Sequence, residues 1–193
     1  MKNLLILLVT LFCVNTCIAQ KGYDPTYGDP KNKKVDTKGF KISNSQLIWQ
    51  KVYESTETID QLTTRLKEDG NVKNIEVTDH TIFGNLDDLY ADYQGAGYGR
   101  AVTPMMLLSQ QIICTVTIEF KTNKFRVTIK NMKLKNTSPT PLSPVGEVEP
   151  IETYVLKKKG TQFKTGFLNA CATILNHTFN KIFENKIEEE DNW

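Results

Sequence analysis

Histidine, cysteine and carboxylate side chains are the residues of this chain that could support catalysis or metal binding. Its two histidines are His80 and His177, and neither has a second histidine or a cysteine at the short spacings that metal sites use. Nucleophilic chemistry would need them to converge with carboxylates or a thiol. Asp79 precedes His80, whereas Asn176 and Thr178 flank His177. The sequence therefore predicts structural or surface roles for both histidines, with no catalytic residue, metal or cofactor.

Two further patterns resemble ligand sites without meeting their requirements. The glycines of segment 95–99 alternate with other residues, and no Lys-Ser or Lys-Thr pair follows them, so neither the dinucleotide nor the P-loop fingerprint is present. Asp87, Asp88 and Asp92 could offer oxygen ligands to calcium, but they lack the spacing of an EF-hand loop. We expect a flexible loop tip at the glycines and solvated carboxylates at the aspartates.

Aromatic side chains make segment 84–110 the candidate binding surface. Tyrosine and arginine are enriched at binding hot spots because they combine apolar area with a polar group. The apolar run 105–108 then either docks this segment or extends an exposed patch. The alternative is that the tyrosines pin the segment onto the domain. The candidate contact residues are Tyr90, Tyr93, Tyr98 and Arg100.

The charge balance argues against a polyanionic partner. The chain has 24 basic and 22 acidic residues, and its net charge of +2 falls to +1 without residues 1–19, which hold only Lys2 among the charged groups. A nearly neutral chain has no strong field to attract nucleic acid. The lysine run 157–159 could touch an acidic lipid or polysaccharide, but we expect a solvated strand end.

The first 19 residues have the pattern of an export signal. Lys2 gives a basic start, residues 4–12 are mostly apolar, and Cys17 and Ala19 are small residues at positions −3 and −1 of a cut before Gln20. The apolar run is too short for a stable membrane anchor. We expect a periplasmic or secreted mature protein without a transmembrane segment.

Lipidation is the alternative route of processing. An acylated Cys17 would make the chain an outer-membrane lipoprotein. Such sites take a small residue just before the cysteine, and Asn15 and Thr16 fit that position poorly, although Val14 suits the −3 position. Cleavage before Gln20 is therefore the preferred prediction.

Residues 20–44 are predicted to be a flexible linker, and residues 45–189 a single domain with an insertion at 84–110 and a tail at 190–193. The expected order is a strand at 47–53, a helix capped by Ser55 or Thr56 and ended by Gly70, and a strand at 74–83. A long hairpin follows the insertion. The elements expected after it are a short strand at 152–158 and an amphipathic helix at 163–189.

The hairpin at 111–134 gives the fold class. Apolar and polar residues alternate along both of its strands, so one face is buried. We predict an α+β fold in which two helices pack on one face of an antiparallel sheet. Cys114 and Cys171 should both be buried, and a disulfide between them remains open. The predicted core pairs sheet residues with helix residues: Ile112, Val116, Ile118, Val127 and Ile129 beneath Phe167, Ile174 and Ile182.

Three segments carry a family resemblance. The strand "LIWQKVYES", the helix "IDQLTTRLKE" and the hairpin "IICTVTIEFKTNKFRVTIKNMKL", after a leading signal, resemble the bacterial domain of unknown function 4468. The resemblance covers residues 45–135, with the last helix completing the fold. It implies a TBP-like, helix-grip-like two-layer architecture and no particular activity. The TBP comparison concerns shape, so it implies no DNA binding.

The sequence thus favours a non-enzymatic envelope or secreted module that binds an envelope protein or a ligand through segment 84–110. The alternative is an envelope hydrolase with an unrecognised active site. A convergent His/Asp/Ser or His/Cys cluster around the largest pocket would favour the hydrolase.

Overall fold

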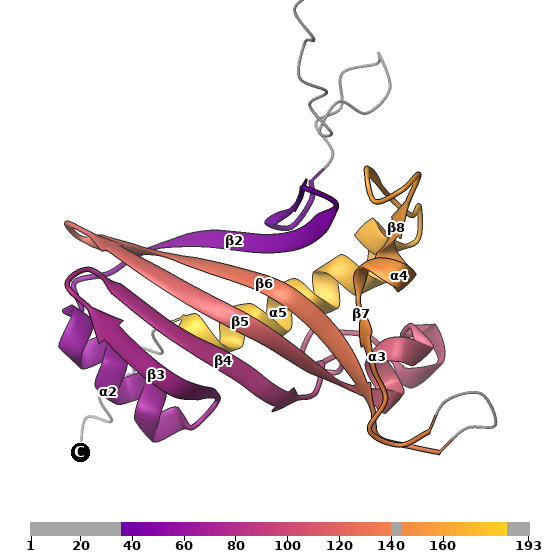
Figure 1. The fold of residues 1–193 in the computed structure, drawn as a ribbon, viewed down its shortest axis with the longest axis horizontal. Helices are drawn as coiled ribbons and strands as arrows, with labels where there is room; N and C mark the ends of the chain where they lie inside the picture. Colours follow the sequence, from indigo (N-terminus) through magenta and orange to yellow (C-terminus); the bar gives the residue numbers. More distant parts are fainter. Residues whose placement is uncertain (1–35, 140–143, 185–193) are drawn as a thin grey trace, which may run out of the picture. The chain divides into compact units, whose positions relative to one another are not determined.

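The structure, a computed structural model, describes residues 36–139 and 144–184, which belong to the unit Val35–Trp193. Its centre is a seven-stranded antiparallel sheet in the order β1-β2-β6-β5-β4-β3, with β7 also paired to β6 (Figure 1). The strands of this sheet are β1 (Phe40–Ser43), β2 (Gln46–Glu54), β3 (Val72–Thr78), β4 (Thr81–Leu89), β5 (Gln110–Lys121), β6 (Lys124–Asn136) and β7 (Val148–Pro150).

Helices cover one face of the sheet. Helix α5 (Ala172–Phe183) runs behind the strands in Figure 1, and the buried residues of α2 (Ile59–Asp69) join the same core. Between the layers, the Trp49 ring lies 5.3 Å from that of Phe179, measured between centroids. All eight predicted core residues are buried, and so are Cys114 and Cys171, which are free thiols. The predicted α+β class and the packing of its core are confirmed.

The β5–β6 hairpin follows the predicted alternation only in part. Val127 and Ile129 of β6 face the core, and then Met132 and Leu134 do so, which shifts the pattern by one residue. A bulge in β6 causes the shift. Ile113 and Thr115 of β5, two residues apart, pair with Lys133 and Lys130 of β6, which are three apart. The extra residue of β6 is accommodated where Asn131 adopts a left-handed φ of 53°. Both halves of this long strand thereby bury their apolar side chains.

Helix α2 begins later than predicted. Its N-cap is Thr58, whose hydroxyl accepts a hydrogen bond from the Gln61 backbone N–H at 3.2 Å, while the Gln61 side chain accepts one from the Thr58 N–H at 2.8 Å. This capping box satisfies two backbone N–H groups at the start of the helix, and no such box forms at Ser55 or Thr56. Gly70 ends the helix with a φ of 65°, as predicted.

The structure corrects two boundaries near the N-terminal half. Strand β1 lies inside the predicted linker 20–44, because Asn44 and Ser45, with φ of 50° and 61°, turn the chain and Phe40 enters the core. The predicted strand 74–83 is a hairpin of β3 and β4 that turns at residues 79–80. Residues 84–89 therefore belong to β4, and the irregular segment between strands covers residues 90–109.

The segment before α5 also differs from prediction. The expected strand 152–158 is a short helix, α4 (Glu152–Val155), followed by β8 (Leu156–Lys157), which pairs with β9 (Gln162–Phe163). Because Phe163 pairs as a strand, the helix cannot start there. It begins instead with a π-helical turn, η2 (Phe167–Cys171), that continues into α5. Residues 185–189 of the predicted helix and the tail 190–193 lie outside the described residues.

The signal 1–19, including Cys17, also lies outside the described residues. No helix in the described part of the chain is both long and apolar enough to cross a membrane. The lysine run 157–159 is exposed on the β8–β9 hairpin, as predicted.

Candidate functional site

Asp92 fastens the segment 90–109 to helix α5. Its backbone N–H donates to the Thr178 hydroxyl at 2.9 Å, and its carboxylate accepts from Lys181 Nζ and from the Gly95 N–H, each at 2.8 Å. These donors, with Lys181 first, hold the pKa of the Asp92 carboxyl below its usual value. Asp92 is therefore a structural anchor, which corrects the expectation of a solvated carboxylate.

Gly95 is required by this anchor. A Cβ at residue 95 would stand 2.5 Å from Asp92 Oδ2 and 2.6 Å from His177 Nε2, closer than real side chains approach. The glycine thus lets the loop close over the carboxylate. The glycines lie in a loop, as predicted, but at Gly95 the expected flexible tip is a turn packed against Asp92 and His177.

The four predicted contact residues occupy two kinds of environment. Tyr93 and Tyr98 are half-buried against the core, and the Tyr98 N–H donates to the Tyr93 carbonyl at 2.8 Å. Tyr90 is 54% exposed, and Arg100 is exposed on the short 3₁₀ turn η1 (Arg100–Val102). The positions of Tyr93 and Tyr98 match the pinning alternative, while Tyr90 and Arg100 are accessible to a partner.

The histidines serve separate parts of the fold. His177 Nε2 lies 3.6 Å from Asp92 Oδ2, so it borders the anchor. His80 lies in the β3–β4 turn, where its carbonyl accepts from the Phe120 N–H at 2.8 Å. Within residues 36–139 and 144–184, no group of three or more His, Cys, Asp or Glu side chains is arranged to hold a metal ion.

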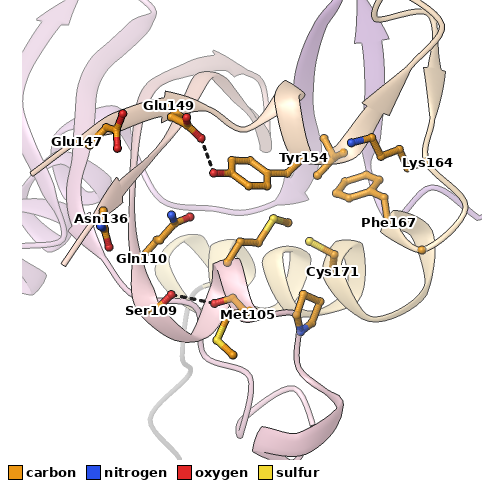
Figure 2. A pocket seen from close by; sticks show the side chains of 14 residues that line it. Met105, Ser109, Gln110, Asn136, Glu147, Glu149, Tyr154, Lys164, Phe167 and Cys171 are labelled. Carbon is orange, nitrogen blue, oxygen red and sulfur yellow. Dashed lines mark hydrogen bonds between the residues drawn. The ribbon is translucent and has the colours of Figure 1, made fainter. Parts of the chain in front are cut away.

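A cleft of about 790 Å³ opens beside the anchored segment (Figure 2). One wall comes from segment 104–110, which includes helix α3 (Met105–Ser109), and the other from the end of β6, from β7, from α4 and from η2. The residues that line it are Pro104, Met105, Met106, Ser109, Gln110, Asn136, Glu147, Glu149, Tyr154, Val155, Lys164, Gly166, Phe167 and Cys171.

Sequence reasoning found only one wall of this cleft. The apolar run 105–108 predicts an apolar patch on this wall, but no pattern in the sequence links it to residues 147–171 of the other wall. That wall begins inside the proline-rich loop 137–150 and continues through the segments predicted as a short strand and a helix. The glycine at 166, inside the predicted helix, was the available signal of a break there.

The floor of the cleft is apolar. Val155, Phe167 and Cys171 are buried beneath it, whereas Met105 is 73% exposed at its edge. The Phe167 ring is held by Phe40, at 5.2 Å edge-to-face, and by Phe163, stacked at 5.3 Å. This floor is therefore rigid, while the methionine edge is flexible and can adapt to a ligand's shape.

Burial also keeps the Cys171 thiol protonated. Removal from water raises the pKa of the Cys171 thiol to about 12, so the thiol is protonated at neutral pH. The other nucleophile type in the lining, the Ser109 hydroxyl, donates to the Met105 carbonyl at 3.1 Å. Among the described residues, neither histidine and no aspartate lines this cleft. The convergent cluster that would favour a hydrolase is not present in its lining.

Polar groups gather on the wall opposite α3. The Tyr154 hydroxyl donates to Glu149, and this bond raises the pKa of Tyr154. Lys164 donates from its Nζ to the Thr153 carbonyl at 2.8 Å. The arrangement can therefore orient a ligand by hydrogen bonds while the floor receives its apolar part.

A second cleft, of about 750 Å³, lies between α2 and α5 and includes Tyr90. Four of its charged side chains form ion pairs within the chain. Lys181 pairs with Asp92, Glu184 pairs with Lys51 at 3.1 Å, and Arg65 forms a two-point bond with Glu57. These pairs explain the polarity of the second cleft as structural, so the apolar cleft is the better candidate site.

Comparisons with known proteins bear on the fold. No family model and no curated protein matches the chain. Two solved structures are similar: a TBP-like protein from Parabacteroides distasonis (12% identity, TM-score 0.46, 74% of this chain and 94% of that one) and a DUF4468 family protein from Bacteroides ovatus (16%, 0.45, 80% and 98%). Their descriptions name the fold and the family that the sequence was found to resemble.

Proposed function

We propose that this protein is a non-enzymatic binding module of the cell envelope that receives an apolar ligand group in the cleft between α3 and η2. The observation that carries the proposal is the lining: a rigid apolar floor, a flexible methionine edge and a polar wall. Ligand sites of this size are typically apolar with a few placed polar groups. The protonated thiol of Cys171 and the hydrogen-bonded hydroxyl of Ser109 favour binding over hydrolysis.

Export is the second part of the proposal, and the sequence supports it. Residues 1–19 have a basic start, an apolar run and small residues before Gln20. The intact mass of protein recovered from the envelope should correspond to a chain that begins at Gln20. A mass that includes a diacylated or triacylated Cys17 would instead make the protein a lipoprotein.

Binding is tested with a neutral apolar dye, N-phenyl-1-naphthylamine, whose fluorescence rises in apolar sites. The blocking variant is Gly166→Phe, because Gly166 lines the cleft and no atom lies within 4 Å of an added Cβ. The matched control is Gly99→Phe, which has the same free space but lies outside the lining. Both glycines have φ near −75°, so a side chain adds no backbone strain.

We expect saturable dye binding to the mature chain and to Gly99→Phe, and at least tenfold weaker binding to Gly166→Phe with an unchanged melting temperature. Equal binding by both variants would place the dye elsewhere and contradict the assignment of the cleft. Absence of saturable binding by the unaltered chain would contradict the proposed function itself.

A further inference from the structure

The polar wall of the cleft is rich in hydrogen-bond acceptors. Glu149 lies in β7 and Glu147 directly precedes this strand, and both line the cleft (Figure 2). The basic group of the lining, Lys164, is labelled at the other end of the view in Figure 2 and donates to the Thr153 carbonyl. The acidic end of the cleft is thus separate from its basic residue.

The Gln110 amide lies at the same end of the cleft (Figure 2). The Tyr154 hydroxyl there gives its single proton to Glu149. The amide oxygen of Gln110, Oε1, can only accept a hydrogen bond.

Gln110 Oε1 is a buried acceptor that receives no hydrogen bond from the described residues. Such groups are rare in proteins because each one carries a desolvation cost. A donor brought by a ligand, after a small displacement of the flexible methionines beside it, would satisfy this oxygen. The same end of the cleft therefore offers two carboxylates and an amide oxygen, all of which accept.

We infer that the ligand is a small amphiphile that carries a primary ammonium or guanidinium group next to its apolar part. This rests on the proposed function of the cleft. The cation binds at Glu147 and Glu149 through charge-assisted hydrogen bonds, and the apolar part lies over Phe167 between the methionines and η2. A volume of about 790 Å³ suits a small molecule. A carboxylate of the same chain length meets like charges there and is rejected.

The test is displacement of the bound dye by three probes with one apolar chain: octylamine, octan-1-ol and octanoate, at pH 7.5 and below their micelle-forming concentrations. We expect octylamine to displace the dye at concentrations at least tenfold lower than octan-1-ol, and octanoate to be the weakest. Glu149→Gln keeps an oxygen that can accept from Tyr154. It should raise the octylamine concentration needed to displace the dye at least fivefold and leave the octan-1-ol concentration unchanged.

The matched control is Glu76→Gln, which makes the same charge change at an exposed position on β3 outside the lining. This variant should leave unchanged the concentration at which each of the three probes displaces the dye. If octanoate competes as well as octylamine, or if Glu149→Gln and Glu76→Gln behave alike, the inference is wrong, while dye binding blocked by Gly166→Phe would still support the proposed function. If the dye does not bind at all, both proposals fail.

Discussion

At the scale of single residues, Asp92 holds the loop 90–109 in place and should make the fold sensitive to acid. Its pKa lies below the ordinary value of 3.8 because Lys181 and the Gly95 N–H stabilise the carboxylate. A group with a depressed pKa contributes its stabilisation above its unfolded pKa and loses it as the pH falls through the folded value. The anchor should therefore be intact at neutral pH and be lost as the pH falls below 3.8 and through the lower pKa of the folded state.

We predict that Asp92→Asn lowers the free energy of unfolding by about 1 kcal/mol at pH 7, the typical cost of one lost charged hydrogen bond at a partly exposed site. The difference from the unaltered protein should shrink as the pH falls below 3.8 toward the lower pKa of the folded state, where Asp92 itself becomes protonated. Urea unfolding at pH 7 and pH 3 measures it. Asp79→Asn, in the exposed β3–β4 turn, is the control. A difference that does not depend on pH would contradict this account.

The tyrosines of the loop should differ in what they stabilise. Tyr93 packs against the core, whereas Tyr90 is mostly exposed. We predict that Tyr93→Ser lowers the free energy of unfolding by about 2 kcal/mol through lost burial, and that Tyr90→Ser changes it by less than about 0.5 kcal/mol. Thermal melts of both variants compare them directly. Equal effects would show that Tyr93 is not a pin.

At the scale of elements, local rules explain where helix α2 begins. Thr58 and Gln61 satisfy each other's backbone N–H groups in a capping box. We predict that Thr58→Ala costs about 1 kcal/mol of stability, whereas Thr56→Ala, outside the box, costs almost nothing. Chemical denaturation gives both values. A larger effect at Thr56 would favour the start of the helix predicted from sequence.

The elements also show what sequence patterns can predict. The β5–β6 hairpin was predictable because period-two alternation specifies a half-buried strand. The bulge at Asn131 was not predicted. The apolar positions of β6 change phase between Ile129 and Met132, but only the register with β5 shows that β6 carries the extra residue. Strand β1 was missed for a related reason: four residues between polar turns carry too weak a period, and burial of Phe40 against Phe167 decides their structure.

At the scale of the whole molecule, Cys114 in the sheet and Cys171 beneath the cleft lie between the two layers. Burial raises the pKa of both thiols, so both should stay protonated and protected in the folded state. We predict that a chain that begins at Gln20, and so lacks Cys13 and Cys17, reacts negligibly with a disulfide reagent at pH 8 when it is folded and unreduced. In urea it should titrate two thiols. A count of zero in urea would mean that a disulfide joins them.

The cleft also depends on the whole molecule, because its walls come from segments that are distant in the sequence. The segment 84–110 was expected to bind by itself through its tyrosines. In the structure two of these tyrosines face the core, and the part of the segment that borders the cleft is 104–110. The facing wall comes from residues 136–171, brought there by the β6–β7 pairing and by η2. No local pattern encodes such a meeting of distant segments, so only the tertiary structure reveals it.

The π-helical turn η2 changes the direction in which its side chains point relative to those of α5. A π-helical turn holds one residue more than an α-helical turn, and each residue of an α-helix rotates the chain by about 100°. Phe167, the first residue of this turn, therefore lies about one residue's rotation away from where a regular helix would place it relative to the stripe of α5. Phe167 is both part of the cleft floor and a buried core residue packed on Phe40. Deletion of Ala170, which would restore a regular helix, should therefore move the cleft floor and this end of the core together, while Ile174 and Phe179 keep their places.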